Sequence, residues 1–381
     1  MTSKERIAVA LKGGIPDRVP VVNIFNMNYL VQELKSTGET FDRFNQANLE
    51  KIIRYQENVG HDPVYYLHTF QEPEMVKLPE SFMKWNPEDT QTWQIRELPA
   101  QTHSDEKVVK RVYTTPQGKM EALLKRTEYQ AWILEHPLKD KTQIELLPYR
   151  CAPEKMDASI LEALVKNLGD KGFFAIGVPS VWQEGCALRG FDKMIYDVSD
   201  DPQWVHEFFQ VLAEYAVRVV HALGKAGVDS VFINESYVGI GMSGKMYREM
   251  VLPYDRKMIA AAEEHEMISS LHICGKCNAL LEDMAESGAT CLEPLVPVDY
   301  SGNVDLADAK RRVGAKVGIW GGLKERVLSE DKPAVKQEVL RCLEAAGEGG
   351  GYVLRGSGQI YDAKQDNLRY LRDLAEQYGT Y

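Results

Sequence analysis

The sequence predicts an α/β protein, a (β/α)8 TIM barrel in which eight parallel strands alternate with helices. From about residue 173 onward, short apolar segments rich in β-branched and aromatic residues alternate with helical patterns. Two further strand candidates precede this region, and a total of eight favours a closed barrel over an open sheet. A third observation is a break in the alternation between residues 75 and 150, which indicates an insertion.

The elements begin with an amphipathic helix, for which Thr2 or Ser3 supplies the N-cap and Glu5 an acidic first turn. The first two strand candidates are residues 18–23 and 62–67. The later six are residues 173–178, 228–233, 267–272, 289–293, 316–320 and 351–354. The helices before four of these strands should each end at a glycine, namely Gly172, Gly227, Gly288 and Gly314.

Residues 75–150 differ from the rest of the chain. Residues 93–98, 108–113 and 120–129 alternate polar and apolar side chains as strands do, and Thr-Pro-Gln-Gly at 115–118 is typical of a turn. We therefore expect an antiparallel β insertion between the second and third βα units of one domain that spans residues 1–381. Such an insertion serves either as a cover for an active site or as a surface for oligomerisation.

The composition narrows the class of function. Hydrophobic residues make up 44% and charged residues 27% of the chain, as in ordinary soluble globular proteins. A net charge of −11 argues against nucleic-acid binding, which requires a basic surface. No apolar segment approaches the roughly 18 residues of a membrane span. The six cysteines are scattered and form no disulfide pattern, so we expect a cytoplasmic protein.

The sequence His-Ile-Cys-Gly-Lys-Cys at residues 272–277 follows one of the predicted strands. Residues two apart in a strand point to the same side, so His272 and Cys274 can converge on one ion. An imidazole and a thiolate form a donor set that suits zinc. The alternative is a buried histidine and a small apolar cysteine at a strand end. Catalytic groups of barrel enzymes lie at this end of the strands, which favours the first interpretation.

Several segments occur in a characteristic order and spacing. They are Glu-Arg-Ile-Ala-Val-Ala-Leu at 5–11, Pro-Asp-Arg-Val-Pro at 16–20, Arg-Gly-Phe at 189–191, Tyr-Arg-Glu and Leu-Pro-Tyr within 247–254, His-x-Cys-Gly at 272–275, and Gly-Gly-Tyr-Val-Leu at 350–354. Through them the chain resembles the uroporphyrinogen decarboxylase superfamily over essentially its full length. The resemblance implies a (β/α)8 barrel, in agreement with the strand count.

The resemblance also separates two kinds of chemistry. True uroporphyrinogen decarboxylases carry an arginine-rich segment after the first strand, whereas residues 23–29 here read Asn-Ile-Phe-Asn-Met-Asn-Tyr. Without guanidinium groups the porphyrinogen carboxylates lose their strongest anchors, so we do not expect that reaction. The other branch contains methyltransferases whose zinc is held by His-x-Cys and by a second cysteine after the last strand. His272 and Cys274 match the first part, but Gly358 stands near the position of the second cysteine.

The missing ligand has several candidates. We predict a zinc site formed by His272, Cys274 and Glu235, which follows the strand at 228–233. As alternatives, Glu235 is a carboxylate at the start of a helix or accepts a hydrogen bond from substrate. Cys277 would complete a Cys-x-x-Cys chelate or face the barrel wall, and Glu293 at the next strand end is a further reserve.

Other polar and aromatic residues lie near predicted strand ends, where they would contact a substrate. Aromatic side chains there suit a methylated small molecule or an aromatic ring, and they equally suit core packing. For the polar residues the alternative is a solvated loop. The predicted substrate-binding residues are Gln183, Asn234, Tyr237, Glu293, Trp320 and Gln359.

Together these observations predict a corrinoid-dependent methyltransferase of the O-demethylase kind. It would move a methyl group between a small methylated substrate, such as a methoxylated aromatic compound, and a corrinoid carried by a partner protein. Zinc would act as a Lewis acid, with Glu235 and His272 as catalytic residues. The alternatives are a metal-independent decarboxylase or lyase that uses the same two residues, and an inactive barrel that serves as a binding subunit. A homodimer is left open.

Overall fold

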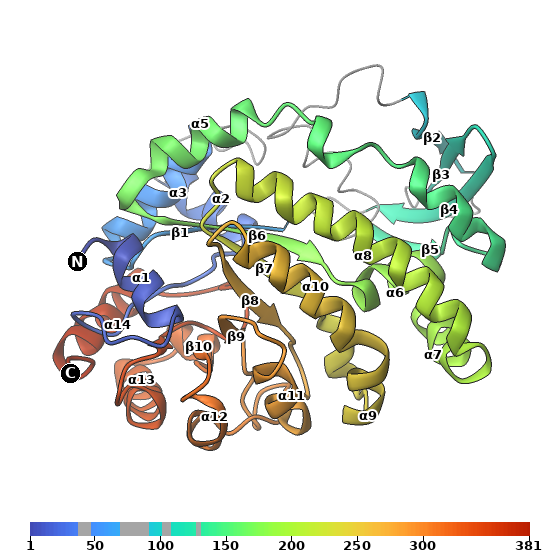
Figure 1. The fold of residues 1–381 in the computed structure, drawn as a ribbon. Helices are drawn as coiled ribbons and strands as arrows, with labels where there is room; N and C mark the ends of the chain where they lie inside the picture. Colours follow the sequence, from blue (N-terminus) through green and yellow to red (C-terminus); the bar gives the residue numbers. More distant parts are fainter. Residues whose placement is uncertain (37–46, 69–90, 101–107, 127–130) are drawn as a thin grey trace.

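The protein folds into a curled parallel sheet surrounded by helices, as the computed structural model shows for residues 1–36, 47–68, 91–100, 108–126 and 131–381 (Figure 1). Seven strands pair in parallel and in chain order. They are β1 (Val64–His68), β6 (Phe173–Pro179), β7 (Ser230–Asn234), β8 (Ile268–His272), β9 (Cys291–Glu293), β10 (Gly318–Trp320) and β11 (Tyr352–Val353).

The first predicted strand completes the wall between β11 and β1. Val21 forms an isolated parallel bridge with Leu354, and Phe25 forms another with Ile360. On the other side, the backbone N–H of Asp62, just before β1, donates a hydrogen bond to the carbonyl of Val21 at 2.8 Å. This segment is extended and bridged only at single residues, but it occupies the eighth position that the sequence predicts.

Helices connect the strands and cover the outside of the sheet (Figure 1). This outer layer and its flanking segments comprise α2 (Met27–Ser36), α3 (Ala47–Asn58), α5 (Ser159–Leu168), α6 (Val181–Arg189), α7 (Phe191–Asp200), α8 (Pro202–Lys225), α9 (Gly244–Met246), α10 (Leu252–Glu263), α11 (Leu281–Ala285), α12 (Leu306–Val313), α13 (Lys332–Ala346) and α14 (Gln365–Tyr378). Apolar faces of these helices pack on the outward side chains of the strands in one large core. No helix in the described part of the chain is long and apolar enough to cross a bilayer.

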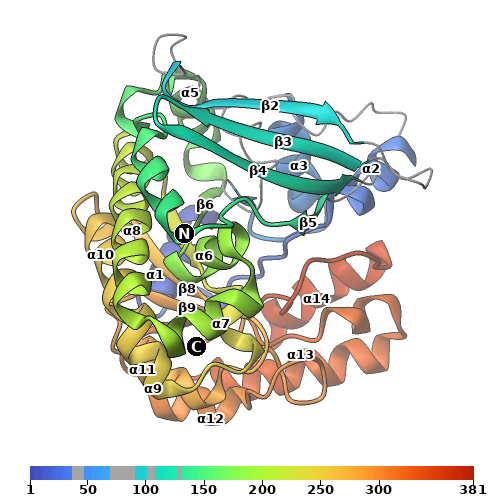
Figure 2. The ribbon, with the colours of Figure 1, turned by 90° about the vertical axis from the view of Figure 1, so that its right-hand side faces the viewer.

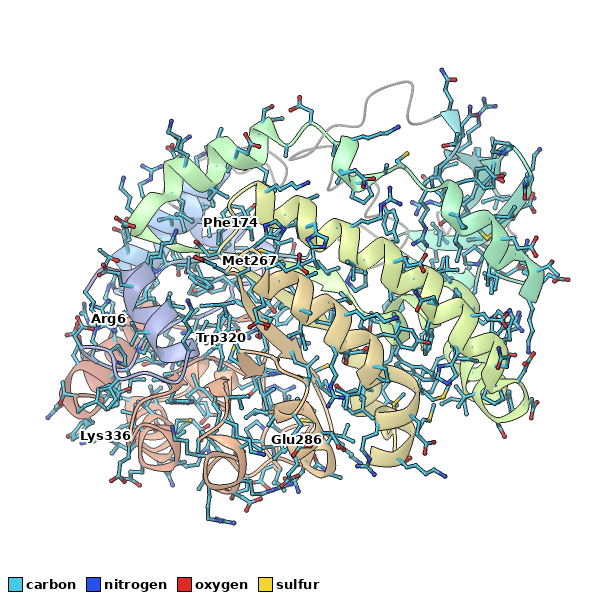
Figure 3. All side chains as sticks on the ribbon, viewed as in Figure 1. Arg6, Phe174, Met267, Glu286, Trp320 and Lys336 are labelled. Atoms are coloured by element: carbon cyan, nitrogen blue, oxygen red, sulfur yellow. The ribbon has the colours of Figure 1, made fainter. Side chains whose placement is uncertain are left out.

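Helix α1 (Ser3–Leu11) closes the amino end of the barrel. Thr2 is its N-cap and forms a reciprocal capping box with Glu5, which decides between the two predicted caps. Ile7 and Leu11 are fully buried in a second, inner core together with inward side chains of the strands, including Trp320. Figure 3 labels Trp320 near α1, which carries Arg6.

The predicted insertion is a four-stranded antiparallel sheet. Its strands, β2 (Gln94–Pro99), β3 (Val108–Thr115), β4 (Gly118–Arg126) and β5 (Ala131–Glu135), pair in this order and come between β1 and β6 in the chain. The sheet forms a layer separate from the barrel strands (Figure 2). The chain directly after β5 adjoins α6, because the N–H of Leu138 donates to the carbonyl of Leu188 at 2.8 Å. Part of the predicted span 75–150, including residues 75–90, lies outside the described residues.

The inner core gives a test of the role of α1. Leu11 is fully buried, whereas Ile15 a few residues later is 58% exposed. We expect Leu11→Ala to lower the free energy of unfolding by about 2–5 kcal/mol, because it leaves a cavity in the barrel floor. Ile15→Ala should change the free energy by less than about 0.5 kcal/mol. Urea denaturation of both variants measures the difference, and equal losses would contradict this account.

Candidate active site

Strand β7 presents alternate side chains to the two sides of the barrel wall. Val231 and Ile233 are buried in the core between the strands and the outer helices. Phe232 points the other way, and its ring stacks on Tyr66 of β1 with centroids 4.0 Å apart. Because side chains alternate along a strand, Asn234 at the end of β7 also faces the interior.

The same alternation brings His272 and Cys274 to one side, as predicted. Leu271 and Ile273 belong to the outer core, so the residues between and after them face inward. Burial alone raises the pKa of the Cys274 thiol, but hydrogen bonds with His272 and Ser236 outweigh this effect and leave that pKa below its usual value. The structure therefore joins an imidazole and an easily ionised thiol at the carboxyl end of β8.

Glu293 at the end of β9 connects His272 to a buried cation. Its Oε1 lies 3.6 Å from the Nδ1 of His272 and accepts a 2.9 Å hydrogen bond from the hydroxyl of Tyr66. Its Oε2 contacts the Nη1 of Arg355, which follows β11. The Arg355 guanidinium lies over the Tyr66 ring at 5.1 Å and over the Trp320 ring at 5.0 Å. Side chains from five strands or strand ends thus meet inside the barrel.

Glu235 lies on the other side of the wall. It follows the inward-facing Asn234, so its fully buried carboxyl group points to the helical layer, beside Asp255 of α10, Ser180 and the backbone amide of Trp182. Burial and the neighbouring Asp255 carboxyl raise the pKa of Glu235 well above its usual value. A protonated carboxyl group in this place is a poor metal ligand.

Of the other candidates for a third ligand, Glu293 lies beside His272 but is paired with Arg355, and Cys277 lies in the core. Cys277 is fully buried, and burial raises the pKa of its thiol to about 12. The N–H of Gly358 donates to Glu325, and a Cβ atom at Gly358 would lie 2.8 Å from a carboxylate oxygen of Glu325. Within the described ranges, no group of three or more His, Cys, Asp or Glu side chains could hold a metal ion by itself. The structure thus does not bring Glu235 to His272 and Cys274.

Two of the predicted substrate-binding amides lie at the carboxyl ends of the strands. Asn234 is fully buried, and its Oδ1 accepts a 2.6 Å hydrogen bond from the hydroxyl of Ser236. Its Nδ2 has no hydrogen-bond partner among the described residues. Gln359 instead accepts a hydrogen bond from Asn26 at 3.0 Å, which links the last and first strands. Asn234 therefore retains a free donor, whereas Gln359 joins two loops.

The remaining predicted residues are Tyr237, Gln183 and Trp320. Tyr237 is half-buried and packs against Phe191, with ring centroids 5.9 Å apart. Gln183 is in the first turn of α6, where its backbone N–H donates to the Ser180 hydroxyl at 3.2 Å, while its buried side-chain Oε1 has no hydrogen-bond partner among the described residues. Trp320 is fully buried in the inner core, so it forms part of the floor under the polar residues. Trp320 thus has the role in core packing that the sequence analysis gave as the alternative for the aromatic residues.

The sequence interpretation missed Tyr66 and Arg355. The alternation of side chains along a strand could have predicted that both residues face the interior. Val353 is buried in the inner core, and Arg355 is two residues further, so it faces the interior as well. A charged residue directly after an apolar strand resembles a loop residue, although charged side chains are rarely buried without a partner. Its ion pair with Glu293 supplies that partner.

The fold and the polar side chains at the strand ends define a barrel enzyme. The sequence profile of the family "Uroporphyrinogen decarboxylase (URO-D)" matches residues 174–378, which is more than half of the chain. The chain therefore belongs to the uroporphyrinogen decarboxylase family.

Individual relatives are more distant. The uroporphyrinogen decarboxylase of Synechocystis sp. is 26% identical over 256 residues, which cover 64% of this chain and 71% of the relative. That of Shewanella amazonensis is 32% identical over 174 residues, or 45% of this chain and 47% of the relative. A solved methyltransferase from Methanosarcina mazei superposes with a TM-score of 0.68 and 17% identity, covering 99% of both chains. This last likeness shows that the barrel fold is shared.

The buried pair of Glu235 and Asp255 predicts a pH dependence of stability. Burial raises the pKa of Asp255 to about 7, despite a hydrogen bond from the hydroxyl of Tyr247. An unfolded aspartate ionises near about 4, so between these two values the folded protein keeps a proton that the unfolded chain loses. The free energy of unfolding therefore falls as the pH rises through this window.

Asp255→Asn should remove part of this fall. We expect the variant to gain stability relative to wild type as the pH rises from 5 to 8, by at most about 1.4 kcal/mol per pH unit. Urea denaturation at both pH values measures the gain. Glu249→Gln, which changes a carboxylate with 60% exposure, is the control and should show no such gain. Parallel stability profiles for Asp255→Asn and wild type would contradict the assignment.

Proposed function

We propose that this member of the uroporphyrinogen decarboxylase family is a methyltransferase that moves a methyl group between a small methylated substrate and the cobalt of a corrinoid protein. The observation that carries the proposal is the pair of His272 and Cys274 at the carboxyl end of β8, with the pKa of the thiol lowered. Such a pair is expected of a metal-assisted transferase. The full-length likeness to a methyltransferase from Methanosarcina mazei supports the same reaction class.

Zinc is the metal that this donor pair suits best. His272 and Cys274 would hold the ion, and since no third such side chain in the described ranges joins them, substrate and water would fill the other positions. Bound zinc would supply Lewis acidity toward the heteroatom that carries the methyl group. Zinc with one thiolate ligand would be a harder Lewis acid than zinc with two. This favours an ether oxygen over a thiol as the heteroatom that carries the methyl group.

The protein groups around the pair would orient the substrate. Asn234 faces the same interior space and has an Nδ2 donor without a partner among the described residues. This amide would donate a hydrogen bond to an oxygen atom of the substrate. Tyr237 follows the same strand and offers an aromatic surface, which suits a methoxylated ring. A methoxylated aromatic compound is therefore the first substrate class to test.

Decarboxylation of a porphyrinogen is the second candidate, because the curated relatives carry that name. Two observations disfavour it. Residues 23–29 contain no arginine, and two of their side chains form internal hydrogen bonds: the Oδ1 of Asn23 accepts from the N–H of Gly356, and Asn26 donates to Gln359. The carboxyl group of Glu235 lies in the helical layer, so it is badly placed as a catalytic acid or base. In a metal-independent reaction that role would pass to His272 and Glu293.

Metal content and methyl transfer test the proposal together. We expect wild type to hold about one zinc per chain, and His272→Ala and Cys274→Ala to lose it, because each removes a ligand. Methyl transfer from a methoxylated aromatic compound to cobalt(I) cobalamin should fall at least about 100-fold in both variants. Mass spectrometry of the metal and the cobalamin absorption spectrum provide the two measurements.

Cys277→Ser is the matched control, because Cys277 is a thiol three residues from Cys274 that is buried in the core and whose pKa is raised by burial. It should keep both the zinc and the activity. Wild-type protein that binds no zinc would overturn the proposed function, and decarboxylation of uroporphyrinogen by that protein would support the second candidate.

A further inference from the structure

The guanidinium of Arg355 is enclosed within the barrel. Arg355 is only 3% exposed, and its charged group lies between the rings of Tyr66 and Trp320. Its ion-pair partner is the fully buried Glu293. Two aromatic faces and one carboxylate therefore fix a cation inside the barrel, in a place that solvent does not reach.

The contribution of the Arg355–Glu293 ion pair to folding stability does not explain its presence. Removing two charges from water costs several kcal/mol per ion in order of magnitude, and replacing a buried ion pair by apolar residues is often neutral or stabilising. The inner core directly below is apolar and would accommodate such a replacement. The pair of Arg355 and Glu293 is thus better explained by what it holds in place than by its own contribution to folding.

What the pair holds is the imidazole of His272. The Oε1 of Glu293 lies 3.6 Å from Nδ1 of the ring, within ion-pair range, while the Tyr66 hydroxyl donates to the same oxygen. The Nδ1 atom is buried and has no hydrogen-bond partner among the described residues. A carboxylate beside Nδ1 favours the tautomer with the proton on Nδ1, which leaves the lone pair on Nε2.

We propose that Arg355 is a positioning residue, which acts through Glu293 to keep His272 in the Nδ1–H tautomer with Nε2 free to bind a metal. Arg355 holds one carboxylate oxygen of Glu293 and the Tyr66 hydroxyl holds the other, so the carboxylate cannot turn away from the ring. The inference rests on the proposed function in that His272 is taken as a zinc ligand. It assigns a role to a residue beyond the His-x-Cys pair.

The test compares variants of the full-length protein by two readouts other than turnover. Affinity for zinc is measured by competition with a chromophoric chelator. The tautomer of His272 in the metal-free protein is read from long-range ¹⁵N–¹H NMR spectra of protein labelled at its eight histidines. The His272 signals are those missing from His272→Gln. We expect the Nδ1–H tautomer in wild type.

Glu293→Gln and Arg355→Met should each weaken zinc binding by about 10–100-fold and shift His272 toward the Nε2–H tautomer. Arg355→Lys keeps the charge but not the fork of donors, so its zinc affinity should lie between those of wild type and Arg355→Met. Arg341→Met is the matched control, because it removes an arginine that pairs with the buried Glu338 at 2.6 Å, away from the site. It should change neither readout.

The outcomes separate the two proposals. Wild-type protein that binds no zinc overturns the proposed function, whatever the tautomer. Wild-type protein that binds zinc, with Glu293→Gln and Arg355→Met retaining both the affinity and the tautomer, overturns only the positioning role. If Arg355→Met fails to fold, Glu293→Gln and Arg355→Lys decide the question by the same two readouts.

Discussion

The side-chain alternation of parallel strands in a closed wall is the constraint on which the rest of this structure depends. Each strand can present only every second residue to the interior. A residue that faces the active site is therefore followed by one that faces the outer helices. His272 and Cys274 share the inward side for this reason. Asn234 and Glu235 are neighbours in the chain and end on opposite sides. The apolar floor formed by α1 then directs the inward polar groups toward the carboxyl ends of the strands.

Above that floor the barrel holds charge, and the charge is arranged in a row. Arg355 contacts Glu293, Glu293 lies beside His272, and His272 interacts with Cys274. Burying any one of these groups alone in a low-dielectric interior would cost free energy. The interaction with the next group in the row offsets that cost. The row begins at the last strand and ends at the loop after β8. A substitution of Arg355 is therefore expected to affect His272 and Cys274, although Arg355 acts on them only through Glu293.

Much of the fold could be predicted from the sequence, because alternating strand and helix patterns are local signals. The Thr2 cap and the convergence of His272 and Cys274 also follow from local rules. The predicted zinc ligand Glu235 directly follows Asn234, the last residue of β7, and its neighbours are Asp255, Ser180 and Trp182 in the helical layer, a proximity that only the folded chain reveals. Arg355 was missed because its partner Glu293 is 62 positions away in the chain, and only the closed barrel brings the two together.

The position of the missing cysteine shows how the site differs from the arrangement that the resemblance implied. Glu325 accepts hydrogen bonds from the N–H of Gly358 and from the hydroxyl of Tyr300, so a carboxylate occupies the space next to residue 358. Placing a cysteine there would require Glu325 to move, because a Cβ atom alone would come within 2.8 Å of its oxygen. Glycine is thus part of a consistent local packing. A metal at His272 and Cys274 would carry one thiolate, keep more of its positive charge and act more strongly on an oxygen atom of a substrate.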